Sequence, residues 1–176
     1  NISSVSGGSY TAAYYGLFGD RLFQDFEQKF LKRNVQNEIA ATMLSPTNLV
    51  SMSSPYYGRS DVLAAYLDQT LFEGKTFADL EKSVRQEKRP FILINATDMS
   101  RTSRFEFTQN QFDLLCSDLG SYKVSRAVAA SSAAAAAERD TEGGVFRLHH
   151  VAQLHIRGNA RHDHGASAGF FRTCGN

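Results

Sequence analysis

The residues Ser4-Val5-Ser6-Gly7-Gly8 overlap the end of a short strand-like segment, 2–5, and precede a run of small residues, 9–17. The first segment is predicted to end a β-strand, and the second to form a helix whose paired alanines allow close packing on a sheet. The two glycines between them allow a tight backbone turn, because glycine has no Cβ. We therefore expect the chain to pass from strand to helix through a sharp bend at Ser6.

The remaining hydrophobic pattern predicts a layered α/β domain. Apolar residues at helical spacing indicate helices, and continuous or alternating apolar runs indicate strands. Helices are predicted over residues 20–44, 60–74, 76–84 and 122–133, and strands over residues 91–94, 104–108 and 112–116. The continuous run 91–94 is expected to be a central strand buried on both faces. Thr76 and Asp79 are expected to form a capping box.

Length and charge restrict the class of protein. A chain of 176 residues is long enough for one domain with a sizeable core. Its net charge of +1 excludes strong electrostatic attraction to nucleic acid. No apolar run reaches the roughly 20 residues needed to span a bilayer. Two cysteines are too few to indicate a disulfide framework, so the cellular compartment stays open.

The pattern changes after Ala133. Residues 134–176 contain all five histidines and show no sustained hydrophobic period. We therefore predict an α/β domain over 1–133 and an irregular segment over 134–176. This segment is either a native mobile region or the product of a shifted reading frame, and sequencing the gene across codon 134 distinguishes the two. Metal ligands need an ordered scaffold, so we do not expect these histidines to form a metal site.

Ser6 is a candidate nucleophile. A hydroxyl needs a neighbouring base to activate it and hydrogen-bond donors that hold the developing oxyanion. In a nucleophile elbow, with the pattern G-x-S-x-G, a strained bend lifts the serine hydroxyl clear of the sheet. Here Ser4 stands in place of the first glycine, and Gly8 is the second. The N–H of Gly7 is the expected oxyanion donor, supported by the positive N-terminal end of the following helix.

The elbow at Ser6 is followed by a predicted strand that ends Ala96-Thr97-Asp98 and by a predicted helix whose residues 126–133 end Ala-Ser-Ser-Ala. In this order, the three segments resemble the patatin-like phospholipase family, over residues 2–133. The resemblance implies a three-layer α/β/α fold and lipid acyl hydrolase activity with a Ser–Asp dyad and no histidine. It makes Ser6 the nucleophile and gives Asp98 a structural, hydrogen-bonding role.

Two elements of that family do not stand where the resemblance places them. The glycine-rich oxyanion loop would precede Asn1, so we expect the chain to be a fragment that is incomplete at its N-terminus. The family's D-G-G motif has its closest match in Glu142-Gly143-Gly144, which makes Glu142 the candidate base and Asp140 the alternative. If neither residue acts as the base, the chain is a non-catalytic scaffold or interaction protein with the family's fold.

The resemblance also implies a partner and a substrate class. These are a lipid or ester substrate and a membrane surface that the protein reaches transiently, without a spanning helix. Acyl transfer to a serine followed by hydrolysis requires no metal or organic cofactor. Ser131 and Ser132 are expected to satisfy backbone groups through their hydroxyls rather than to bind substrate.

Overall fold

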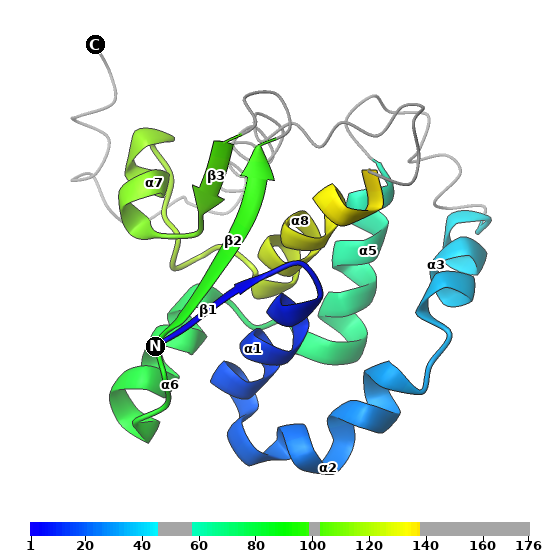
Figure 1. Ribbon diagram of the computed structural model, residues 1–176, viewed down its shortest axis with the longest axis horizontal. Helices are drawn as coiled ribbons and strands as arrows, with labels where there is room; N and C mark the ends of the chain where they lie inside the picture. The colour runs from blue at the N-terminus through cyan, green and yellow to red at the C-terminus, as the bar shows by residue number, and fades with distance from the viewer. Residues whose placement is uncertain (46–57, 99–102, 138–176) are drawn as a thin grey trace, which may run out of the picture.

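The computed structural model describes residues 1–45, 58–98 and 103–137, which form a small sheet with helices packed against it (Figure 1). The strands are β1 (Ile2–Val5), β2 (Ile92–Asp98) and β3 (Ser103–Glu106), in the order β1-β2-β3. β1 and β2 are parallel, whereas β2 and β3 are antiparallel. The described chain therefore belongs to the general α/β class, as the sequence predicts.

A parallel strand pair needs a long crossover connection, because the chain must return to the same end of the sheet, and such connections are usually helical. The described chain between β1 and β2 is accordingly mostly helical. Its helices are α1 (Gly7–Phe18), α2 (Leu22–Phe26), α3 (Val35–Met43), α5 (Arg59–Leu67) and α6 (Phe77–Glu87). Short 3₁₀ or π-helical turns extend them at η1 (Gly19–Arg21), η2 (Glu27–Leu31) and η3 (Asp68–Phe72). After β3 come α7 (Gln109–Leu114) and α8 (Val124–Ala137).

β2 is the central strand, with α1 and α8 packed against it and α5 packed on α8 (Figure 1). Ile92, Ile94 and Ala96 are buried on one face of this strand. On the opposite face, Leu93 and Thr97 are only half-buried. The predicted central position is confirmed. The burial on both faces predicted for residues 91–94 is wrong for the half-buried Leu93 and for Phe91, which precedes the strand and is 50% exposed.

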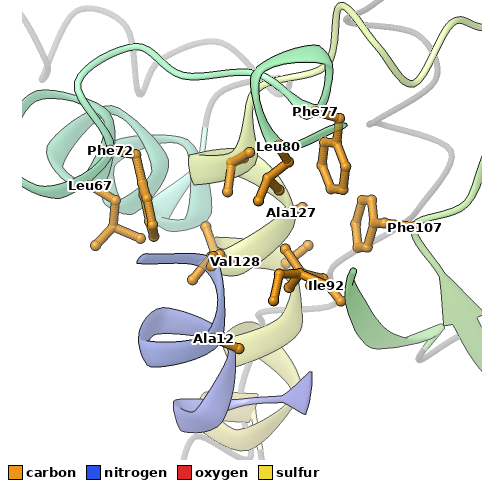
Figure 2. Close-up of a cluster of buried hydrophobic side chains, with 14 of the residues drawn as sticks. Ala12, Leu67, Phe72, Phe77, Leu80, Ile92, Phe107, Ala127 and Val128 are labelled. Atoms are coloured by element: carbon orange, nitrogen blue, oxygen red, sulfur yellow. The ribbon is translucent and has the colours of Figure 1, made fainter. Parts of the chain in front are cut away.

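Small residues let α1 approach the sheet closely. A Cβ added to Gly16 would lie 2.5 Å from Ile92 Cγ1 and 2.8 Å from Leu80 Cδ2. Figure 2 shows Ala12 of α1, Ile92, Leu80 and Val128 gathered in this part of the core. The predicted close packing of α1 on the sheet is therefore confirmed.

Gly16→Ala is expected to lower the free energy of unfolding by about 1–2 kcal/mol, because forced overpacking outweighs the gain in helix propensity. Urea denaturation measures this loss. The control is a double-mutant cycle with Ile92→Ala, which removes the nearer of the two side chains that the new methyl group would meet. The double variant should lose less stability than the sum of the single losses. Strict additivity of the two losses would contradict a steric origin.

One predicted helix begins as expected, and another is interrupted. The predicted capping box is present, since the Thr76 N–H donates to Asp79 Oδ2 at 3.0 Å and α6 follows directly. The single helix predicted over 20–44 is wrong, because helical structure stops at Leu31 and restarts at Val35. The side chain of Asn34 accepts the Asn37 N–H at 3.2 Å and thereby caps the new helix α3.

The strand predicted over 112–116 is also wrong, because α7 occupies most of this stretch. Phe112 is buried, but Leu114 and Cys116 are exposed, so the apparent alternation does not define one buried face. A hydrogen bond from Gln109 Nε2 to Asp113 Oδ1, at 2.7 Å, joins successive turns of the helix. Local polar pairing at helical spacing therefore prevails over a three-residue apolar pattern.

A charged network fixes the start of the helical crossover. The buried Tyr14 of α1 donates its hydroxyl hydrogen to Asp25 Oδ1 at 2.6 Å. Asp25 Oδ2 lies 2.8 Å from Lys29 Nζ and 3.3 Å from a guanidinium nitrogen of Arg21. The hydrogen bonds from Lys29 and then Tyr14 lower the pKa of Asp25 to about 2. The charged form of Asp25 is thus the form that the fold stabilises.

Asp25→Asn is expected to destabilise the protein at pH 7, with a deficit that shrinks in acid. The folded-state pKa of about 2 lies below the ordinary value of 3.8. The stabilisation by the charge is therefore complete well above pH 3.8 and is lost as the pH falls towards 2. Urea midpoints at pH 7, 5 and 3 measure this, with the exposed Asp20→Asn as a control for net charge. An equal deficit at pH 7 and pH 3 would contradict the charge-based explanation.

Candidate active site

Ser6 lies at the bend where β1 ends and α1 begins, as the sequence predicts. Its backbone has φ 53° and ψ −129°, a conformation that residues with a Cβ rarely adopt. Such a conformation costs of order 1–3 kcal/mol and persists only where the surrounding structure enforces it. The bend is therefore strained as well as sharp.

The Ser6 hydroxyl has no hydrogen-bond partner among the described residues, although the side chain is half-buried. Gly7 and Gly8 form the first turn of α1, and a Cβ added to either would meet nothing within 4 Å. Their N–H groups have no acceptor within the helix, as is general for the first residues of a helix. The Ser9 N–H, by contrast, is occupied by the Ser6 carbonyl at 3.0 Å. Among the described residues, N–H donors without a helical acceptor thus lie next to a hydroxyl without a partner.

A buried serine 125 residues further along the chain holds the bend. The Ser6 N–H donates to Ser131 Oγ, on α8, at 2.9 Å. Ser131 is fully buried, and its hydroxyl donates to the Asn95 carbonyl on β2 at 2.5 Å. Ser9 Oγ lies 2.8 Å from Ser131 Oγ. The elbow is therefore joined to both the central strand and the last described helix.

The other side of the bend is held by the Asn95 side chain. Its Nδ2 donates to the Ser4 carbonyl at 2.9 Å and to Ser3 Oγ at 3.0 Å. In the parallel register Asn95 is the partner of Val5, so this carboxamide lies level with the end of β1. Asn95 Oδ1 is buried and has no hydrogen-bond partner within the described chain.

The serines at the end of the predicted helix behave as expected towards backbone groups. Ser131 accepts from one backbone N–H and donates to one carbonyl. Ser132 donates to the Val128 carbonyl at 2.7 Å and accepts the Tyr10 hydroxyl at 2.8 Å. The sequence did not indicate that the backbone partners of Ser131 lie on other elements, because nothing in a local pattern reports a contact 125 residues away.

An open apolar groove lies beside the elbow. Its volume is about 530 Å³, and it is lined by residues of β1, α1 and α2. The apolar lining residues are Ile2, Val5, Ala12, Tyr15, Leu22 and Phe23. Val5 and Gly8, which flank the Ser6-Gly7 bend, both line it, so the groove reaches the candidate nucleophile's immediate neighbours. No local sequence pattern indicates this groove, because its walls come from three elements.

Other residues singled out from the sequence cannot be placed at the bend. Glu142, Asp140 and all five histidines lie outside the described residues. Among the residues that are described, no carboxylate bonds to the Ser6 hydroxyl, and no group of three His, Cys, Asp or Glu side chains is arranged to hold a metal ion. Asp98 ends β2. The described site thus consists of a candidate nucleophile and candidate oxyanion donors, and no described carboxylate is bonded to that nucleophile.

Within residues 1–45, 58–98 and 103–137, no helix has the length and apolar character to cross a membrane. No family model, no curated protein and no solved structure matches this chain. The assignment of a function to Ser6 therefore depends on the geometry of the bend and on the sequence around it.

Proposed function

We propose that this chain is a serine acyl hydrolase of the patatin-like type, acting on lipid esters, with Ser6 as its nucleophile. One observation carries the proposal: the strained backbone at the β1–α1 bend presents a hydroxyl that no described residue binds. Neighbouring serines use their hydroxyls in structural hydrogen bonds, as Ser9, Ser131 and Ser132 do. Backbone strain often marks functional sites, and a serine whose hydroxyl is not so used is available to react once a base activates it.

In the proposed reaction, Ser6 Oγ attacks the ester carbonyl carbon while its proton passes to a carboxylate. Glu142 is the proposed base and Asp140 the alternative. The carbonyl oxygen becomes an oxyanion, which the Gly7 N–H and the N-terminal end of α1 stabilise. Collapse of this intermediate releases the alcohol, which takes up the proton and leaves an acyl-serine. Water then attacks the acyl-serine while the carboxylate takes its proton. Collapse of this second intermediate releases the acid and returns the proton to Ser6 Oγ.

The groove supports an ester with an apolar acyl chain as the substrate. Its apolar walls meet the bend at Val5 and Gly8. Burial of apolar surface contributes about 25 cal/mol per Å², so a chain lying in such a groove gains affinity without polar recognition. Lipid esters at a membrane surface are therefore the proposed substrate class.

A fluorophosphonate probe and p-nitrophenyl butyrate test the proposal together. The wild-type protein should be labelled and should hydrolyse the ester, whereas Ser6→Ala should do neither. Ser103→Ala, at an exposed serine on the same sheet, is the matched control and should behave as wild type. Labelling that survives in Ser6→Ala would exclude Ser6 as the nucleophile.

A non-catalytic scaffold is the second candidate. It is favoured by the observation that no described carboxylate bonds to the Ser6 hydroxyl. The same experiment separates the two candidates, because a folded wild-type protein that is neither labelled nor active would support the scaffold. Circular dichroism and a cooperative urea transition show whether the protein tested is folded.

A further inference from the structure

We propose that Ser131 is a positioning residue that holds Ser6 in its strained conformation through a serine latch, defined as the Ser131 hydroxyl with its three partners. These partners are the Ser6 N–H, the Ser9 hydroxyl and the Asn95 carbonyl. The inference rests on the proposed function, because a positioned nucleophile matters only if Ser6 reacts. Ser131 itself does not touch the reacting atoms.

The direction of each hydrogen bond in the latch follows from proton counting. A hydroxyl has one hydrogen to donate and two acceptor sites. The Asn95 carbonyl can only accept, so the Ser131 hydrogen points to it, over 2.5 Å. Ser131 Oγ then accepts the Ser6 N–H at 2.9 Å. Because its own hydrogen is used, it can only accept from Ser9, whose one hydroxyl hydrogen is shared between Ser131 Oγ at 2.8 Å and Ser4 Oγ at 3.3 Å. The Ser131 hydroxyl is thus fully used, and it is oriented by β2.

The latch is anchored in the rigid part of the molecule. Ser131 is 1% exposed, and its neighbours Ala127, Val128 and Ala130 on α8 are equally buried. α8 packs against both β2 and α5. A close-packed helix of this kind moves little, so it provides a fixed acceptor for the Ser6 N–H.

Asn95 makes the latch a two-sided clamp. Its backbone carbonyl orients Ser131, which holds the residue at the bend. Its side chain donates to the Ser4 carbonyl, which holds the strand two residues earlier. Both hydrogen bonds come from Asn95 on the central strand. The backbone of Ser4 and that of Ser6, on either side of Val5, are therefore fixed relative to β2.

Loss of the Ser131 hydroxyl would leave the Ser6 N–H and the Asn95 carbonyl without this partner. The strain at Ser6 would then be free to relax, and the hydroxyl and the Gly7 N–H would shift together. A displacement of about 1 Å at a reacting group can slow a reaction roughly 10²-fold. Ser131→Ala should therefore lower kcat by 10- to 100-fold, while KM changes little because the groove is untouched.

The latch is tested by amide hydrogen exchange of the ¹⁵N-labelled protein, read at the Ser6 N–H, together with the rate of fluorophosphonate labelling. Ser131→Ala should speed exchange at Ser6 at least 10-fold beyond any change at Ile94 in the core, and should slow labelling. Ser125→Ala is the matched control, because Ser125 is also 1% exposed, lies on α8, and bonds to Asp68 rather than to the elbow. It should leave exchange at Ser6 and the labelling rate as in wild type.

Two results would overturn the latch: unchanged Ser6 exchange in Ser131→Ala, or an equal loss of labelling in Ser125→Ala. The exchange measurement does not depend on activity. A wild-type protein that is not labelled would therefore contradict the proposed function, whereas the Ser6 exchange rate would still decide whether Ser131 holds the bend.

Discussion

Replacing Ser6 by glycine is expected to abolish ester hydrolysis and, at the same time, to make the protein more stable by about 1 kcal/mol. The φ of 53° at this position strains any residue with a Cβ, whereas glycine adopts positive φ freely. The relief of strain is offset in part by the greater freedom of glycine in the unfolded chain. No described hydrogen bond of the Ser6 side chain is lost, and the N–H that Ser131 accepts is retained.

Ser6→Ala is the matched variant, because it removes the same oxygen but keeps the Cβ. Its stability should lie within about 0.5 kcal/mol of wild type. Both variants should lower kcat for p-nitrophenyl butyrate at least about 10³-fold, as the loss of a nucleophile does. Urea denaturation and initial rates measure the two effects on the same preparations.

The order of stability of Ser6→Gly and Ser6→Ala tests the backbone conformation at position 6. If the Ser6→Gly variant were less stable than Ser6→Ala, the positive φ at position 6 would not be present in solution. If both variants kept the wild-type rate, Ser6 would not be the nucleophile, whatever its conformation. An active site that is stabilised by removing its reactive residue is the signature of strain retained for function.

The elbow itself was predictable from the sequence because its determinants are local. An apolar-flanked strand, two glycines and a run of small residues specify a strand, a bend and a close-packed helix within 18 residues. The same holds for the capping box of α6, where Thr76 and Asp79 lie three residues apart. Each of these features depends on neighbours along the chain, which periodicity and capping rules describe well.

The errors occur where short patterns compete with polar side chains. Three apolar residues at alternate positions predicted a strand where Gln109 and Asp113 support a helix. A continuous helical pattern did not reveal that Asn34 would cap a new helix in its middle. In both places a local side-chain hydrogen bond accompanies the observed conformation, and the apolar pattern does not report it.

The latch and the groove could not be predicted from the sequence, because both depend on tertiary packing. Ser131 was expected to satisfy backbone groups and does so, but those groups lie at the bend and on β2 rather than in its own helix. Asn95 looked like one residue of a buried strand, and it anchors both sides of the bend. The sequence thus predicted the bend at Ser6 and missed the residues that hold it.

The largest effect on stability is expected from Phe107→Ala, which should lower the free energy of unfolding by about 3–5 kcal/mol. Phe107 directly follows β3 and is 1% exposed. Its ring contacts four other aromatic rings, with centroid distances of 5.2–6.1 Å, those of Phe77, Phe105, Phe112 and Tyr122. Figure 2 shows Phe77 of α6 and Phe107 facing each other across this part of the core.

The size of this loss follows from what the ring joins. Phe77 begins α6, Phe112 lies on α7, and Tyr122 precedes α8, so a cavity at Phe107 removes contacts with all three segments at once. Phe23→Ala is the matched control, because the same side chain there is 79% exposed, and its loss should stay within about 0.5 kcal/mol. If Phe107→Ala is too unstable to measure, Phe107→Leu should show an intermediate loss. A loss below about 1 kcal/mol for Phe107→Ala would mean that the aromatic cluster is not packed as a unit, and that β3 and α7 are held to the domain by other contacts.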